Sequence, residues 1–141
     1  MHPMTDEQRR AFLSAGRRTA KLATVRADGT PHVVPVWFVL DGDDWLFTTG
    51  ADTVKGRNLQ RDPRASLCVD EVEPDAAFVT VTGTAALSED PAALLHWATV
   101  LGGRYMGADR AEEFGRRNGV PGELLVRVTP RRTTALGGIT D

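Results

Sequence analysis

The chain has only one cysteine, Cys68, and only two lysines, Lys21 and Lys55, among its 141 residues. A lone cysteine excludes a disulfide framework within the chain and suits a reducing compartment. The N-terminal segment has no signal-peptide core, and no apolar run reaches the length that spans a bilayer. We therefore expect a cytoplasmic protein with no membrane partner.

Several common functional motifs are also missing. The histidines His2, His32 and His96 do not have the spacing of metal ligands, so no zinc site is expected. No Gly-x-Gly-x-x-Gly motif indicates a Rossmann site, and no serine lies in a nucleophile elbow. The net charge of −2 and the lack of interleaved basic and aromatic residues argue against a nucleic-acid partner.

The composition favours one globular domain spanning residues 1–141. Apolar residues make up 41% of the chain and charged residues 26%, which is enough apolar material for a core and too little charge for a disordered chain. No repeat, low-complexity tract or linker divides the sequence.

Short β-rich segments alternate with turn signals such as Asp28-Gly29 and Asp41-Gly42. This pattern predicts a mainly β, α+β protein whose six or seven antiparallel strands close into a barrel. The expected strands are 21–25, 32–39, 45–49, 65–69, 78–87, 123–128 and about 133–136.

A few peripheral helices are expected around this barrel. Thr5 and Gln8 form the pattern of a capping box, which predicts a helix from there to about Gly16. Further helices are expected over 53–60, 90–101 and 109–117. Gly102-Gly103 is expected to end the helix over 90–101 or to kink it.

One stretch has the character of a phosphate site. Thr48 and Thr49 end a strand, a glycine follows, and the next helix opens with Lys55 and Arg57. Orphan backbone N–H groups, hydroxyls and a cation at a helix start suit an anionic group. The alternative is an ordinary strand-to-helix turn, in which the threonines cap the helix and the cations are solvated.

The sequence resembles a known family, the pyridoxamine-phosphate-oxidase-like split-barrel superfamily. Its closest likeness is to small actinobacterial members that use the deazaflavin coenzyme F420. The likeness covers about residues 10–137 and rests on the order and spacing of five segments. These are Leu22-Ala23-Thr24-Val25, Asp28-Gly29-Thr30-Pro31-His32, Pro35-Val36-Trp37-Phe38, Lys55-Gly56-Arg57-Asn58-Leu59 and Arg61-Asp62-Pro63-Arg64-Ala65.

The resemblance implies a split β-barrel that forms a homodimer with a cofactor at the subunit interface. By the same resemblance, Thr48, Thr49 and Lys55 would hold the cofactor phosphate, with Arg57 and Asn58 nearby. Asn58 could instead stabilise the turn. Three further residues, Pro35, Val36 and Trp37, would lie along the ring system.

The choice of cofactor depends on Lys55. Family members that use FMN often carry two adjacent basic residues where this chain has Val54-Lys55. A single lysine favours F420, whose phosphodiester leads into a polyglutamate tail that Arg57, Arg61 and Arg64 could attract. FMN remains the alternative, and the arginines could equally be solvated surface groups.

The resemblance implies a reductase that transfers a hydride to a small unsaturated or quinone-like molecule. The alternatives are an FMN-dependent oxidoreductase on the same fold and a non-enzymatic cofactor or haem binder. No catalytic residue is assigned, because the cofactor supplies the chemistry. Tyr105 could face the substrate and donate a hydrogen bond, or be a core tyrosine with its hydroxyl at the surface.

The segment Val33–Val39 is apolar with almost no polar alternation. A strand of this kind has to be covered on both faces. The barrel interior would cover one face, and either a second subunit or the helix over 90–101 would cover the other.

Overall fold

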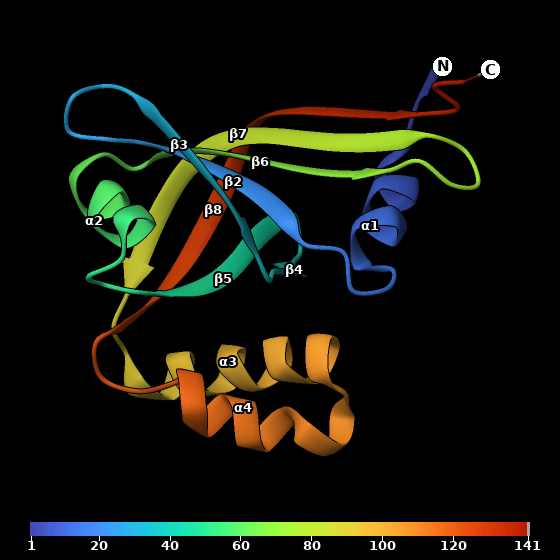
Figure 1. The fold of residues 1–141 in the computed structure, drawn as a ribbon. Coiled ribbons are helices and arrows are strands. Elements are labelled where there is room, and N and C mark those ends of the chain that lie inside the picture. Colours follow the sequence, from blue (N-terminus) through green and yellow to red (C-terminus); the bar gives the residue numbers. More distant parts are fainter. Residues whose placement is uncertain (141) are drawn as a thin grey trace.

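The computed structural model describes residues 1–140, in which eight strands form one antiparallel sheet (Figure 1). The strands are β1 (His2–Pro3), β2 (Ala20–Val25), β3 (Pro31–Val36), β4 (Val39–Asp41), β5 (Asp44–Gly50), β6 (Arg64–Glu71), β7 (Ala77–Ser88) and β8 (Glu123–Gly137). Their order is β3-β2-β6-β7-β8-β5-β4, with β1 added to the end of β8. The strand count is higher than expected because β1 was not predicted and the expected strand 32–39 is two strands, β3 and β4, although the last two expected strands are one, β8.

The two edge strands of this sheet, β3 and β4, are consecutive in the chain. Only Trp37 and Phe38 separate β3 from β4, the strands at the two ends of the order. Within residues 1–140 no ladder joins β3 to β4, so the expected hydrogen-bonded closure of the barrel is wrong. The physical reason is that the two strands follow one another along one stretch of chain, which cannot pair with itself without a turn. The expected mainly β, split-barrel fold class is confirmed.

The last strand is continuous where the sequence suggests two. In the pairing of β7 with β8, Thr82 lies opposite Arg132 and Gly83 opposite Pro130, which leaves Arg131 as an extra residue. Such a bulge lets one strand bend without ending. A Cβ atom on Gly83 would lie 2.2 Å from the Thr129 carbonyl oxygen, so this close approach requires glycine.

Four α-helices and one 3₁₀ turn accompany the sheet. They are α1 (Asp6–Ser14), α2 (Val54–Arg61), α3 (Pro91–Met106), the 3₁₀ turn (Ala108–Arg110) and α4 (Ala111–Asn118). The capping box at the start of α1 is confirmed, since Thr5 accepts from the Gln8 N–H and Gln8 accepts from the Thr5 N–H. Within the described residues, no helix is both long and apolar enough to cross a membrane.

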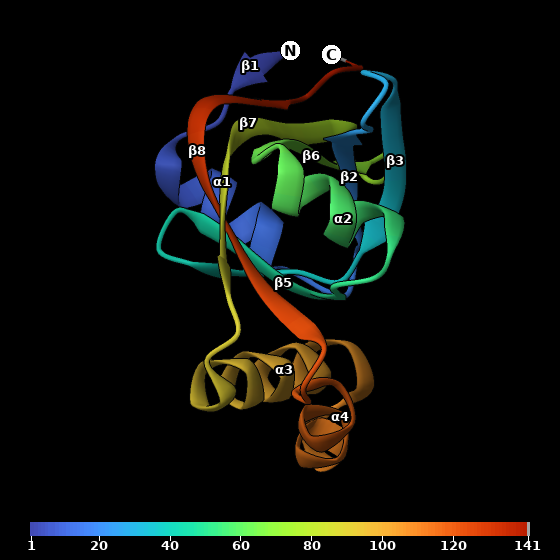
Figure 2. The same ribbon diagram turned by 90° about the vertical axis from the view of Figure 1, so that its left-hand side faces the viewer.

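Helices α3 and α4 form a hairpin that packs below the barrel (Figures 1 and 2). Helix α3 continues through Gly102 and Gly103, so the expectation that it ends there is wrong. A Cβ atom on Gly102 would lie 2.7 Å from the Phe114 Cβ. Gly102 therefore does not end α3. Its lack of a side chain allows α4 to pack closely against α3.

Two apolar clusters hold these layers together. The larger fills the barrel, where Phe38 stacks on Trp45 with ring centroids 4.7 Å apart. The smaller lies between the helical hairpin and the barrel wall, and it contains Leu46, Leu101 and Tyr105. This second cluster fixes the hairpin relative to β5 and β8, and so shapes the space between them.

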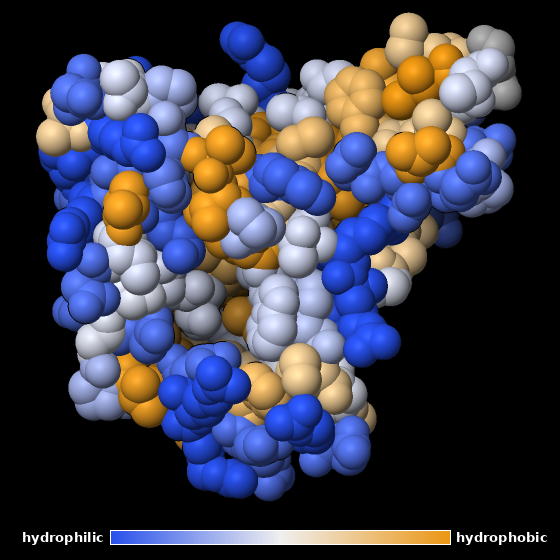
Figure 3. All heavy atoms as spheres, viewed as in Figure 1, coloured by the Kyte–Doolittle hydropathy of each residue, from blue (hydrophilic) through white to orange (hydrophobic). Residues whose placement is uncertain are grey.

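Helix α3 is not the cover for the outer face of β3. It packs against β5 and β8, while Val33 on β3 remains 67% exposed and Pro35 is also exposed. Figure 3 shows hydrophobic atoms at the surface in the region of β3. The apolar outer face of this strand is therefore uncovered in one copy of the chain.

Candidate functional site

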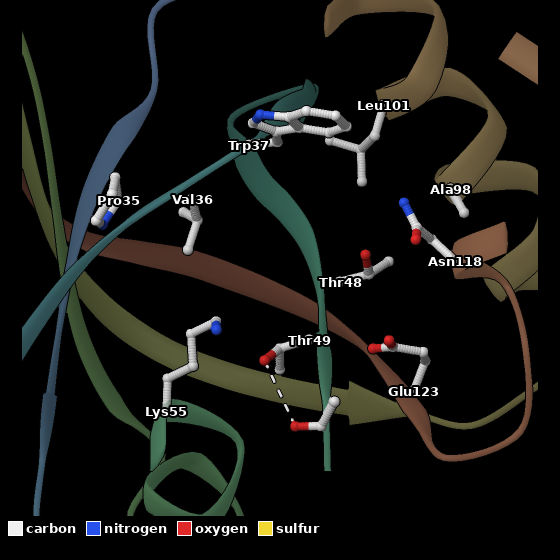
Figure 4. Close-up of a pocket in the computed structure, with 11 residues that line it drawn as sticks. Pro35, Val36, Trp37, Thr48, Thr49, Lys55, Ala98, Leu101, Asn118 and Glu123 are labelled. Carbon is white, nitrogen blue, oxygen red and sulfur yellow. Dashed lines mark hydrogen bonds between the residues drawn. The ribbon is translucent and has the colours of Figure 1, made fainter. Parts of the chain in front are cut away.

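A cavity of about 260 Å³ lies between the barrel and the helical hairpin. In Figure 3 the surface is hollowed between these two parts, and Figure 4 shows the side chains that line the cavity. The lining residues come from six elements and from the link after β3: Pro35, Val36, Trp37, Thr48, Thr49, Gly50, Lys55, Ala98, Leu101, Asn118 and Glu123. Six of the eight residues expected from the sequence to hold a cofactor are among them.

The end of β5 brings two hydroxyls to the cavity. Thr49 is buried, and its hydroxyl shares a 2.9 Å hydrogen bond with that of Thr53. Thr53 is the N-cap of α2 and accepts from the Gly56 N–H at 3.1 Å. Helix capping is therefore the task of Thr53, with Thr49 supporting it. The Thr48 hydroxyl has no hydrogen-bond partner within residues 1–140 and faces the cavity (Figure 4).

Lys55 enters the same cavity from the first turn of α2 (Figure 4). A Cβ atom on Gly56 would lie 2.2 Å from the Gly50 carbonyl oxygen, so the first turn of α2 sits directly on the end of β5. This approach holds Lys55 half-buried beside Thr48 and Thr49. Among residues 1–140 its ammonium group forms no ion pair, which leaves a cation free to bind an anionic group.

The aromatic wall of the cavity is Trp37, which follows β3. Its ring is half-buried and stacks on Tyr105, and Phe114 lies against it at a tilt, with centroids 6.0 Å apart. Pro35 and Val36 continue the same wall. The structure thus brings together the three residues that the resemblance assigns to the ring system.

Tyr105 does not face the cavity, and neither expectation for its hydroxyl holds. The hydroxyl is inside the protein, where it accepts from the Phe38 N–H at 3.1 Å. It lies 2.9 Å from the Arg18 carbonyl oxygen and 3.1 Å from that of Phe38, its two possible acceptors. Burial raises the pKa of Tyr105. The hydroxyl is engaged by the backbone and does not reach the cavity.

Arg57 and Asn58 are the two expected residues that the structure does not bring to the cavity. Asn58 is only 4% exposed, and its side-chain amide donates to the Thr24 hydroxyl at 3.0 Å. Arg57 is exposed on α2 and does not line the cavity. Asn58 thus joins α2 to β2.

The expected positive surface beyond α2 is weaker than its arginine count suggests. Arg64 binds Asp62 at 2.7 Å, and its hydrogen bonds lower the pKa of that carboxyl to about 2. Arg61 donates to the Val25 carbonyl oxygen and to the Asn58 side chain. Of the three arginines, only Arg57 has neither an ion pair nor a side-chain hydrogen bond within residues 1–140.

Sequence reasoning missed the residues that the helical hairpin and β8 supply, above all Asn118 and Glu123. Glu123 is half-buried, and burial raises its pKa while the charge of Lys55 opposes that shift. No local pattern marks these residues. Glu123 reaches the cavity because the register of β5 and β8 places it opposite Gly50.

Solved structures show the same fold. A conserved hypothetical protein from Mycobacterium tuberculosis is 28% identical to this chain, with a TM-score of 0.84, over 96% of this chain and 86% of that one. A protein described as an F420 reductase is 27% identical, with a TM-score of 0.67, over 87% and 94% of the two chains. The haem storage protein HutZ from Vibrio cholerae is 21% identical, with a TM-score of 0.73, over 98% and 100%; this likeness shows the fold alone.

A family model that matches most of the chain identifies the family. The family model described as pyridoxamine 5'-phosphate oxidase matches residues 5–137. That range includes every residue that lines the cavity. This chain belongs to the pyridoxamine 5'-phosphate oxidase family of split-barrel proteins.

Proposed function

We propose that this protein is a reductase that uses the deazaflavin coenzyme F420. The observation that carries the proposal is the convergence of one unpaired cation, Lys55, one free hydroxyl, Thr48, and one aromatic wall, Trp37, on a single cavity. The F420 reductase that shares 27% of its residues with this chain supports the same choice. The fold alone would not decide it.

The residues present fit such a cofactor. Lys55 and Thr48 would hold its phosphate, because an ammonium group and a hydroxyl are both donors to phosphate oxygens. Pro35, Val36 and Trp37 would lie beside the ring system and keep water from it. When bound, the cofactor supplies a hydride for an unsaturated or quinone-like substrate. The protein has to position the two partners and shield them.

A second copy of the chain would complete the site. A volume of about 260 Å³ is below the usual range for a ligand pocket, and a whole deazaflavin with its tail is larger than that. Pro35, on one wall, lies on β3, whose outer face is uncovered. We propose a homodimer with the cofactor between subunits. The free Cys68 suits its action in the cytoplasm.

FMN is the alternative cofactor, and Val54 is the residue that argues against it. Val54 lies just before Lys55, and Lys55 is the one cation among the lining residues of the described chain. A phosphate monoester carries more charge than a diester and calls for a second cation. A haem in this cavity is disfavoured for a different reason, since among residues 1–140 no histidine, cysteine or methionine lines it.

The test is a cofactor titration. We expect protein purified from a host without F420 to be colourless, and to bind F420 tightly and FMN weakly when each is added. The absorption spectrum of the purified protein and the two titrations measure this directly. Yellow protein that carries stoichiometric FMN would show that the choice of F420 is wrong.

A further inference from the structure

Glu123 is a carboxylate in a cavity otherwise suited to an anion. It begins β8, pairs in register with Gly50, and points into the cavity opposite the side from which Lys55 enters (Figure 4). Its carboxyl oxygens have no hydrogen bond and no ion pair with any residue of the range 1–140. Without a protein partner, this half-buried carboxyl group is free to interact with a molecule bound in the cavity.

The position of Glu123 joins the cavity to the outside. Glu123 also lines a neighbouring, mostly apolar pocket with Glu89 and Leu94, and an open hollow with Asp52 and Pro121. Asp52 and Pro121 are exposed, so this hollow opens to solvent. Glu123 therefore lies where the cavity and this solvent-open hollow adjoin, a position in which its carboxyl group can exchange protons with water.

The surroundings of Glu123 raise the pKa of its carboxyl group. Burial is the largest influence and raises its pKa, and Asp52 raises it further by repulsion between like charges. Lys55, from α2, lowers it. Glu89 is the other titratable group that shares a pocket wall with Glu123. With the net shift upward, the protonated form persists to a higher pH than in an ordinary glutamic acid.

We propose that Glu123 is the proton donor of the reaction. This inference rests on the proposed function and adds a residue to it. When bound and reduced, F420 would supply a hydride to the β-carbon of a substrate whose carbon–carbon double bond is conjugated to a carbonyl group. The π electrons move toward the carbonyl group, leaving an enolate. The Glu123 O–H bond then breaks, its proton goes to the α-carbon, and the carboxylate regains a proton from water through the hollow beside Asp52.

The test compares Glu123→Gln with the wild-type protein, both loaded with reduced F420, in single turnovers with 2-cyclohexen-1-one and 2-cyclopenten-1-one. We expect the substitution to slow product formation by about a hundredfold or more, the usual contribution of a general acid. The wild-type rate should fall as the pH rises through the pKa of Glu123, and this dependence should be lost in Glu123→Gln. Glu123→Asp should restore part of both.

The matched control is Glu89→Gln, which removes the same charge from the wall of the neighbouring pocket but not from the cavity. Its rate and pH profile should be those of the wild-type protein. Glu123→Gln should bind F420 at least as tightly as wild type, because the substitution removes a negative charge opposite Lys55. A merely structural role would instead weaken binding and leave the pH profile unchanged.

A second readout needs no cofactor. Carbon-13 NMR of glutamate carboxyl groups in the unliganded protein should show one resonance whose pKa is raised relative to an ordinary glutamic acid and which is absent from Glu123→Gln. If the wild-type protein binds F420 and reduces the enones, but Glu123→Gln does so at the same rate and with the same pH profile, only the proton donor is wrong. If the wild-type protein does not bind F420, the proposed function fails and this inference with it.

Discussion

Trp37 lies flat on Tyr105, with ring centroids 4.9 Å apart and ring planes 3° apart. The two rings play different parts, because Trp37 lines the cavity and Tyr105 is buried behind it. The Tyr105 hydroxyl is fixed by the backbone of Arg18 and Phe38. A buried tyrosine thus holds the aromatic wall of the cavity in place, although it does not enter the cavity itself.

We predict that Tyr105→Phe destabilises the protein while leaving the cavity wall in place. The substitution removes the hydroxyl that accepts from the Phe38 N–H inside the protein, and a buried polar group left unpaired costs about 1–3 kcal/mol. The ring remains, so Trp37 keeps its stacking partner. Urea unfolding should show the loss of free energy, and F420 affinity should change little. Equal stability of the variant and the wild type would show that these hydrogen bonds do not matter.

Asn58 gives a second test that separates structure from binding. Because its amide donates to the buried Thr24 hydroxyl, we predict that Asn58→Ala lowers the free energy of unfolding by about 1–3 kcal/mol. Its affinity for F420 should match that of the wild type. The control is Arg57→Ala on the same helix, an exposed position whose substitution should change stability by less than about 0.5 kcal/mol. A loss of affinity in Asn58→Ala without a loss of stability would place Asn58 in the binding site.

The parts of this fold that were predictable from sequence are those that depend on local patterns. The Thr5 capping box, the strand over 45–49 and the helix start at Thr53 follow from neighbouring residues and are found where they were expected. The family resemblance placed Lys55 and Trp37, which the structure brings to one cavity. Their predicted contact with a cofactor remains a prediction.

The parts that were missed depend on distant packing. Gly102 has the local pattern of a helix end, yet it continues α3 because Phe114 on α4 needs the space that a side chain would fill. Glu123 reaches the cavity only through the register of β8 with β5. Asn58 lies next to a predicted anion site in the sequence, but the helix turns its side chain toward β2. Contacts between segments that are distant in the chain produce no recognisable pattern in the local sequence.

Lys55 is the most direct test of the anion site. We predict that Lys55→Ala weakens F420 binding by roughly ten- to a hundredfold, since a hydrogen bond from a charged group is worth about 1.5–3 kcal/mol. The control is Lys21→Ala, which removes the only other lysine, an exposed side chain 3.9 Å from Asp70 and away from the cavity. Fluorescence titration of both variants measures the dissociation constants. An unchanged constant for Lys55→Ala would show that the phosphate binds elsewhere.

The last prediction concerns assembly, and it starts from the outer face of β3. Val33 is 67% exposed there, in a region where Figure 3 shows hydrophobic atoms at the surface. Helix α3, the competing cover, packs against β5 and β8 instead. We expect a second subunit to cover this face through a two-fold interface, and cofactor binding to depend on it.

Analytical ultracentrifugation at low micromolar concentration, with and without F420, measures this assembly. The wild-type protein should sediment as a dimer, and Val33→Asp should shift it toward monomer and weaken F420 binding together, because the interface would then bury an unpaired charge. Its own fold should be retained, since Val33 is exposed in the single chain. The control is Val72→Asp, at a 68% exposed position beyond the end of β6, which should remain dimeric. A monomer that binds F420 at full affinity would contradict both the interface and the shared site.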